Sequence, residues 1–213
     1  MSTLLTQQER EEKKRLARES EIRQNIKSHC TRIRDGIRKN GSTSGNRAIW
    51  ELFQNAGDQA ESAEIKITLT NEHFIFAHKG EAFTFDSLCS LVKQVSSQEK
   101  EDDIKVGQYG TGFLTTHKFS RKILVNGSMR ISDKNEPEVY VDIDKFVIDR
   151  SNFDDIPLFI EDMKNQILAV EELMDHDLQS YHREWTELFY ELNDERRNIV
   201  QVAYSTSSIC YDN

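Results

Sequence analysis

The segment RAIWELFQNAGDQA, residues 47–60, constrains the fold of this chain more than any other segment. At about 100° per residue, its apolar side chains fall on one face of a helix; they are Ile49, Leu52, Phe53, Ala56 and Ala60. The opposite face carries Glu51, Asn55, Asp58 and Ser62, where a surface helix would usually mix Lys and Glu. Such an oxygen-rich face suits a hard cation such as Mg²⁺ and the water or phosphates it carries. The alternative is an ordinary solvated helix face.

A glycine-rich segment, VGQYGTGF at residues 106–113, is the second informative motif. Glycine lets a backbone approach a ligand closely because it has no Cβ. The next residues, FLTTHKFS, predict the beginning of a helix, whose free N–H groups and dipole favour phosphate. The segment matches neither the GxGxxG of dinucleotide-binding folds nor the GK[ST] of a P-loop. It therefore predicts a phosphate-binding loop of another kind, and an ordinary turn is the alternative.

Together, the two segments resemble the GHKL, or Bergerat-fold, ATPases, which include heat-shock protein 90 chaperones, type II topoisomerases and histidine kinases. ELFQNAGDQA is similar to the N-box of this family, ExxxNAxDA, and its initial Glu is typical of the chaperone and topoisomerase kind. GQYGTGF is similar to the GxxGxG box with its following aromatic residue. The resemblance is close over residues 45–127 and looser over residues 20–192.

One stretch departs from the family pattern. The family usually has DxGxG between the two boxes, and its Asp accepts a hydrogen bond from the adenine amino group. Here the stretch is FAHKGEAF, so that His78 replaces the Asp and Ala82 replaces the second Gly, whereas Gly80 is kept. A neutral His can still accept one hydrogen bond through a ring nitrogen. A similar His-for-Asp pattern is associated with sacsin-like branches of the family.

The resemblance implies roles for individual residues. Glu51 would be the general base that polarises the attacking water, and Asn55 would bind Mg²⁺ through its side-chain oxygen. Asp58 would hold the water network beside the base. Ser96, Ser97 and Lys100 would lie in a lid that closes over ATP, and Thr186 would lie near the adenine pocket. The remaining nucleotide contacts would be His78, Gly80, Gly107, Gln108, Tyr109, Gly110, Thr111, Gly112 and Phe113.

Composition and charge limit the class of protein. The 213 residues can form one good core, and no apolar run is long enough for a membrane span or a signal peptide. Cys30, Cys89 and Cys210 lack CxxC spacing, as expected of thiols in a reducing compartment, so a cytoplasmic protein is expected. Residues 1–47 carry twelve Lys and Arg against six acids, a net +6, within a chain of net charge −9. A basic start could contact nucleic acid or an acidic partner, although it lacks interleaved aromatics and a solvated helix is the alternative.

The order of periodic segments predicts an α+β fold, specifically a two-layer α/β sandwich with helices on one face of a mixed, mainly antiparallel sheet. Helices are expected over residues 6–39, 47–60, 85–95 and 159–182 and again from residue 193. Strands are expected over residues 64–70, 73–78, 121–127, 129–133, 138–144 and 186–192, with turns at residues 126–127 and 135–137. We expect an N-terminal helical arm over residues 1–44, the ATP-binding domain over residues 45–192, and a C-terminal helix and tail over residues 193–213. That tail would lead to a transducer or middle domain absent from this chain.

The expected function is Mg²⁺-dependent binding and slow hydrolysis of ATP by a chaperone-like domain, with lid closure as a conformational switch. Three alternatives remain open at this stage. The first is a nucleotide-binding switch that does not hydrolyse ATP. The second is a histidine kinase with His29 as phosphoacceptor, although His29 lies too close to Glu51 for the helical hairpin of kinases. The third is a protein-interaction or self-association module that uses the N-terminal helices as its contact surface.

Overall fold

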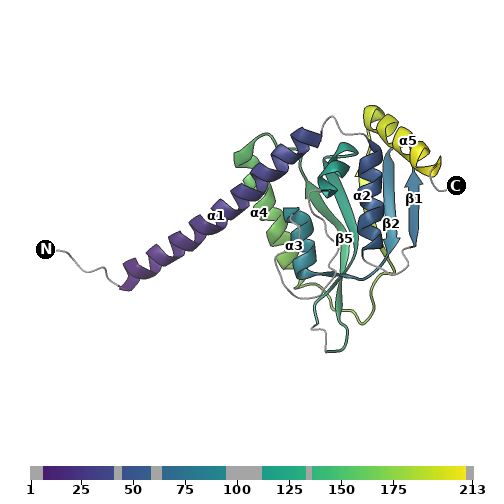
Figure 1. Ribbon diagram of the computed structural model, residues 1–213. Helices are drawn as coiled ribbons and strands as arrows, with labels where there is room; N and C mark the ends of the chain where they lie inside the picture. Colours follow the sequence, from purple (N-terminus) through teal and green to yellow (C-terminus); the bar gives the residue numbers. More distant parts are fainter. Residues whose placement is uncertain (1–6, 41–44, 59–63, 95–111, 133–135, 210–213) are drawn as a thin grey trace.

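The computed structural model describes residues 7–40, 45–58, 64–94, 112–132 and 136–209. Over these residues the chain is an α+β protein with an open, mainly antiparallel sheet, as the sequence predicts (Figure 1). The helices are α1 (Gln7–Lys39), α2 (Gly45–Gly57), α3 (Phe85–Lys93), the 3-10 helix η2 (Phe113–Lys118), α4 (Ile156–Leu173) and α5 (Asp194–Ile209). The strands are β1 (Ile65–Leu69), β2 (His73–Lys79), β3 (Phe83–Thr84), β4 (Lys122–Arg130), β5 (Tyr140–Asp149) and β6 (Trp185–Glu191).

The last strand in the sequence lies inside the sheet. The order is β1-β2-β6-β4-β3. Strand β5 pairs with β4 along the edge of β4 that faces away from β6. Every pairing is antiparallel except the short pairing of β3 with β4. Because β6 lies between β2 and β4, Thr186 is brought opposite His78 in the register of β2 and β6.

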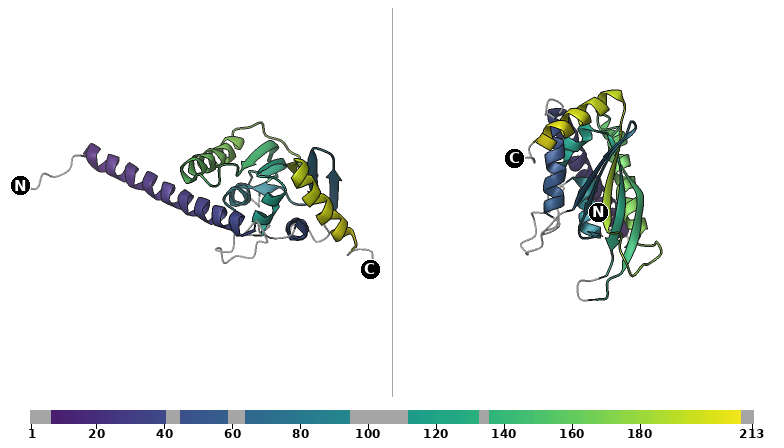
Figure 2. Two further views of the ribbon diagram at one scale, coloured as in Figure 1. Left: turned by 90° about the horizontal axis from the view of Figure 1, so that it is seen from above. Right: turned by 90° about the vertical axis from the view of Figure 1, so that its right-hand side faces the viewer.

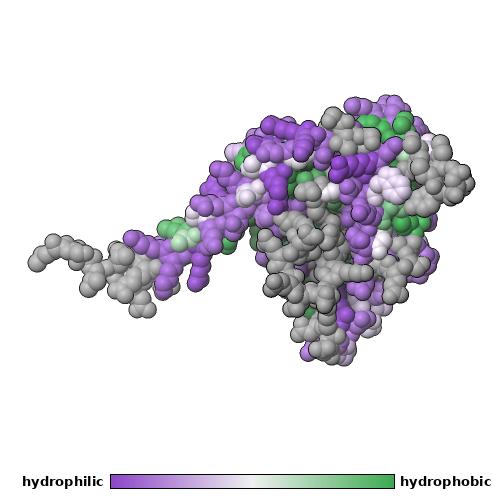
Figure 3. Space-filling model, viewed as in Figure 1, coloured by the Kyte–Doolittle hydropathy of each residue, from purple (hydrophilic) through white to green (hydrophobic). Residues whose placement is uncertain are grey.

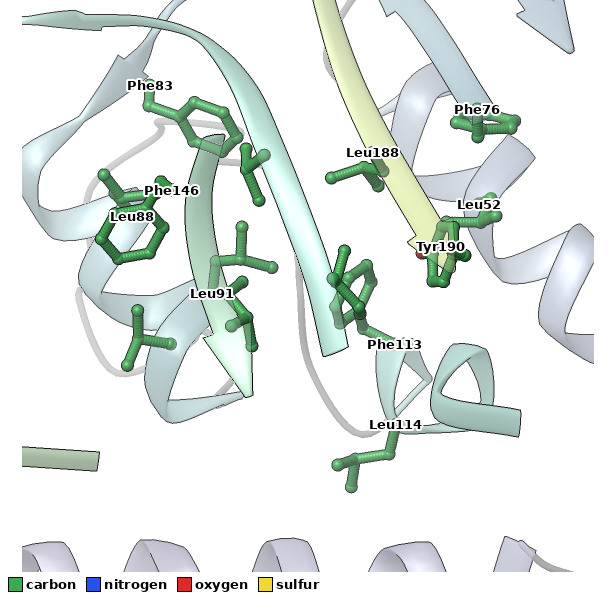
Figure 4. Packing of buried hydrophobic residues seen from close by; sticks show 14 of the residues in the cluster. Leu52, Phe76, Phe83, Leu88, Leu91, Phe113, Leu114, Phe146, Leu188 and Tyr190 are labelled. Carbon is green, nitrogen blue, oxygen red and sulfur yellow. The ribbon is translucent and has the colours of Figure 1, made fainter. Parts of the chain in front are cut away.

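One face of the sheet forms the core. Along β2 and β6, the alternate residues Phe76, Leu188 and Tyr190 are buried, whereas Ile75 and Phe189 between them are only partly buried. Leu52 of α2, Phe113 of η2 and Leu88 and Leu91 of α3 pack into the same cluster (Figure 4). Helix α4 contacts α1, α3 and β5. The molecule is thus a two-layer arrangement of helices and sheet, and in the edge-on view of Figure 2 both α2 and α5 lie on one side of the strands.

Helix α1 has two different halves. Its second half packs on α4 and η2 through residues one helical turn apart, namely Ile26, Cys30, Ile33 and Ile37. From residue 12 to residue 25 every side chain is exposed, and the helix extends away from the sheet (Figure 1). The surface of this outer half is mostly hydrophilic (Figure 3). The apolar residues Leu16 and Ile22 in this half are 50% and 58% exposed.

Two predicted features differ from the structure. Asn126-Gly127 is not a turn between two strands but a bulge within the single strand β4. The Asn126 side chain stabilises the bulge, since Nδ2 donates to Glu187 on β6 and Oδ1 accepts from the Lys145 backbone N–H. The helix expected over residues 159–182 is instead Ile156–Leu173, beginning after the N-cap Asp155. It ends earlier because the following segment returns to the sheet, where Gln179 and Tyr140 exchange two backbone hydrogen bonds.

Candidate functional site

Helix α2 holds Glu51 and Asn55 beside the core. Its buried residues Ala48, Ile49, Leu52 and Ala56 fix the rotation of the helix, so that Glu51 and Asn55 lie one turn apart on its flank. The Glu51 side chain is 20% exposed and accepts a hydrogen bond from Arg47 Nε at 3.4 Å. Arg47, one turn before Glu51, therefore places a cation beside the face that was predicted to be rich in oxygen.

The end of the glycine-rich segment lies against Glu51. A Cβ placed on Gly112 would overlap the Glu51 carboxylate, and it would come within 3.0 Å even of the more distant oxygen, Oε1. Gly112 is in turn tied to the first turn of η2, because its carbonyl accepts hydrogen bonds from the Thr115 backbone N–H at 3.0 Å and from Thr115 Oγ1 at 2.8 Å. The two motifs singled out in the sequence thus meet at Gly112 and Glu51, and a Cβ at position 112 would displace the carboxylate.

Asn55 is a buried polar residue with unused hydrogen-bonding capacity. Its side chain is 7% exposed, and its Nδ2 has no hydrogen-bond partner within the described part of the chain. Leaving a buried amide without a partner costs about 1–3 kcal/mol, so such a group is usually kept for a ligand or for water. An amide oxygen is a suitable Mg²⁺ ligand when phosphates and waters supply the rest of the shell. The unpartnered Nδ2 is a donor and cannot bind a cation, so a fit to nucleotide-bound magnesium depends on the Asn55 side-chain oxygen alone.

His78 lies on the core face of β2 and is 2% exposed. Burial lowers the pKa of His78, and the contact of Nδ1 with the Lys79 carbonyl at 3.4 Å partly opposes this. In the neutral ring that donates from Nδ1 to this carbonyl, Nε2 remains as an acceptor. The ring lies 6.2 Å from that of Phe76, which meets Phe53 of α2 edge-on at 5.7 Å. Packing therefore joins His78 to the helix that carries Glu51 and Asn55.

Thr186 completes the part of the site around His78. It is 6% exposed and is the Cα partner of His78 in the β2–β6 register. Its Oγ1 lies 3.3 Å from the position that a Cβ would take on Gly127 in the β4 bulge. A buried imidazole and a buried hydroxyl from two neighbouring strands thus lie on one face of the sheet, which can supply both a hydrogen-bond acceptor and a donor to a ligand.

The other predicted site residues lie after the ends of elements, in the core, or outside the described residues. Asp58 follows the end of α2 and is exposed, and Gly80 follows the end of β2 and is half-buried. The Phe113 side chain is fully buried in the core, so only its backbone could face a nucleotide. The predicted residues Ser96, Ser97, Lys100, Gly107, Gln108, Tyr109, Gly110 and Thr111 lie outside the described residues.

Three buried polar residues were not predicted, namely Gln94, His117 and Arg150. Gln94, the left-handed C-cap of α3, is fully buried and contacts His117 of η2 at 2.5 Å between Nε2 atoms. Burial and the nearby Arg150, Arg121 and Arg196 hold the pKa of His117 well below its usual range. Arg150 is also fully buried; Nη1 donates to Gln166 and Nη2 to the Val92 carbonyl, whereas Nε has no hydrogen-bond partner among the described residues. No sequence signal distinguishes these residues from surface ones, because their burial depends on how α1, α3 and α4 pack on β5.

Comparisons of the sequence with protein-family models and with curated proteins found no match. Within the described ranges, no helix has both the length and the apolar character needed to cross a membrane. The same residues contain no group of three or more His, Cys, Asp and Glu side chains placed to hold a metal ion. The magnesium expected here would depend on the Asn55 amide together with oxygens brought by a ligand.

Proposed function

We propose that this chain is a GHKL-type ATP-binding domain that binds ATP with Mg²⁺ and hydrolyses it slowly. The observation that carries the proposal is the contact of Gly112 with Glu51, because it joins the carboxylate of the N-box-like helix to the end of the glycine-rich box. The residues expected to bind the nucleotide would then follow the ligand from its phosphates to its base. Phosphates would lie near Glu51 and Asn55, and adenine would lie near His78 and Thr186.

In this proposal the Glu51 carboxylate orients the attacking water and accepts its proton. Its flank position on α2 keeps it partly exposed, so water can reach it. Asn55 offers its amide oxygen to Mg²⁺, and the ion would supply charge neutralisation to the phosphates. The backbone after the glycine-rich box enters η2, whose hydrogen bonds from Thr115 to Gly112 hold the chain close to Glu51.

His78 takes the place of the adenine-binding Asp. Burial favours the neutral imidazole, and a neutral imidazole can accept a hydrogen bond from the adenine amino group. The neighbouring Thr186 hydroxyl can donate to a ring nitrogen of the base. An imidazole accepts only one hydrogen bond, whereas a carboxylate accepts several, so base selection is expected to be weaker than in relatives that have the Asp.

A second candidate is a nucleotide-binding switch without hydrolysis. It is favoured by the hydrogen bond from Arg47 Nε to Glu51, which occupies a carboxylate oxygen that the attacking water would need. Both functions share the same nucleotide site. They differ in whether Glu51 is released from Arg47 when the nucleotide binds.

The test is calorimetric titration of ATP and ADP into the full chain, with and without Mg²⁺, followed by steady-state measurement of phosphate release. The ATPase proposal expects saturable binding at one site that Mg²⁺ strengthens, together with slow phosphate release. Binding without release would favour the switch. Absence of saturable binding at millimolar nucleotide would refute both functions.

A further inference from the structure

A polar cavity of about 230 Å³ lies at the junction of α1, η2 and α5, apart from the residues of the nucleotide site. Its lining includes Ile37 of α1 and Asn40 just after that helix, Thr115, His117 and Lys118 of η2, Arg121 before β4, and Glu195, Arg196 and Ile199 of α5. Sites for drug-sized ligands occupy about 300–1,000 Å³, so this cavity suits a smaller group.

Positive charge converges on the cavity although the whole chain has a net charge of −9. Three of its described lining side chains are cationic, Lys118, Arg121 and Arg196, against the single carboxylate of Glu195. Glu195 is exposed and forms no ion pair with a described residue. The Arg121 and Arg196 guanidinium groups alone therefore outnumber the single carboxylate of the described lining.

The two arginines repel each other. Burial and, next, the charge of Arg196 lower the pKa of Arg121, and Asp154 opposes this only in part. Asp154 is already engaged by Arg38 in an ion pair of 2.6 Å. The Arg121 guanidinium stacks over the Phe153 ring at 4.7 Å and has no ion pair with a described carboxylate. Stacking of this kind holds the guanidinium in place and leaves its N–H groups available.

From these observations we infer that the cavity binds a small phosphate anion, either inorganic phosphate or pyrophosphate, through Arg121 and Arg196. An anion between the two guanidinium groups replaces their repulsion with charge-assisted hydrogen bonds, which arginine forms with phosphate in a bidentate manner. Arg196 belongs to α5, whereas Arg121 follows η2. The bound anion would therefore hold α5 against η2. The inference of an anion site does not rest on the proposed ATPase activity.

The test is calorimetric titration of phosphate and pyrophosphate into the full chain at constant ionic strength, with chloride as the reference salt. Wild-type protein should show saturable binding and a higher melting temperature in phosphate than in chloride. Arg121→Gln and Arg196→Gln should each weaken binding about tenfold or more, because each loses charge-assisted hydrogen bonds. Arg121→Lys should bind with intermediate affinity, since it keeps the charge but loses the bidentate geometry.

Two controls separate this site from other causes. Arg130→Gln removes the same charge from the end of β4, where Arg130 pairs with Glu138, and should leave phosphate binding unchanged. Asn55→Ala alters the proposed nucleotide site and should also retain phosphate binding. Equal affinity in wild-type, Arg121→Gln and Arg196→Gln would overturn the inference. So would an equal loss in Arg130→Gln, or a loss confined to Asn55→Ala.

Discussion

Gly112 lies so close to the carboxylate of Glu51 that no side chain can be added to it without moving Glu51. The two residues come from separate motifs, one at the end of the glycine-rich box and one on α2, and the core between α2 and η2 brings them together. This contact gives the nucleotide-site proposal its most direct test, because it can be disturbed by a single methyl group.

Gly112→Ala should reduce ATP hydrolysis without unfolding the protein. The new methyl would displace the Glu51 carboxylate, and a small misplacement of a catalytic group can cost about 10²-fold in rate. Gly57→Ala at the end of α2 is the matched control, because a Cβ there would meet no atom within 4 Å. Phosphate release and circular dichroism of both variants provide the measurement. Unchanged hydrolysis in Gly112→Ala would show that the position of Glu51 does not matter for the reaction.

Glu51→Ala and Asn55→Ala should have different effects. If Glu51 is the base, Glu51→Ala should lower hydrolysis by about 10²-fold or more, while ATP still binds. Asn55→Ala should weaken nucleotide binding chiefly in the presence of Mg²⁺, because it removes the proposed metal ligand. Titration of ATP with and without Mg²⁺ separates the two effects. Equal loss of binding in both variants would mean that this face of α2 has only a structural role.

ATP affinity should depend on pH through His78. Burial lowers the pKa of His78 below the usual value of about 6.5, so the acceptor form persists at neutral pH and is lost only as the pH falls further. Affinity should therefore be flat from pH 8 to about 6.5 and decline below this range. The same burial makes the fold less stable in that acidic range, since the unfolded chain takes up the proton first. Binding should accordingly be measured only where circular dichroism shows a folded protein.

Three substitutions complete the test of His78. His78→Asp should sharpen the preference for ATP over GTP, because an unmet carboxylate penalises the wrong base. His73→Gln changes a histidine at the opposite end of the same strand and should leave the pH profile unchanged. A profile that remains flat to pH 5.5 in folded protein, with normal ATP binding by His78→Ala, would leave His78 without a role in recognition.

Arg150→Ala should destabilise the fold strongly. The guanidinium is fully buried, and burial lowers its pKa to about 10. Its removal leaves the Val92 carbonyl without this donor, takes one of two donors from the Gln166 amide oxygen, and creates a cavity beside Phe159. Together these effects should reduce the free energy of unfolding by about 3 kcal/mol or more. Urea denaturation measures the loss.

The control for Arg150 is Arg130→Ala on the surface. Arg130 pairs with the exposed Glu138 at 3.3 Å, and such pairs contribute about 0–1 kcal/mol. Similar losses in the two variants would show that the burial of Arg150 contributes nothing beyond an ordinary surface charge.

Local patterns were enough to predict most of the elements. The helical periodicity of residues 47–60 predicted α2 and the burial of Ile49, Leu52 and Ala56, but Asn55, expected on the opposite face, is buried as well. Alternating apolar residues predicted β2 and β6. These predictions succeeded because helical and strand periodicities depend on neighbours within a few positions. The prediction of a turn at Asn126-Gly127 was wrong because it used the local sequence alone. A bulge and a turn share this dipeptide, and only the neighbouring strands distinguish them.

The sequence by itself determined most of the helices and strands, the α+β class and the two motifs that nominate Glu51, Asn55 and the glycines. Tertiary structure alone decided that β6 lies between β2 and β4, which sets Thr186 opposite His78. It also decided that Gly112 meets Glu51 and that Arg121 and Arg196 share one cavity. The physical reason is that strand order and helix packing follow from burying one continuous apolar surface over the whole chain, which no local segment specifies.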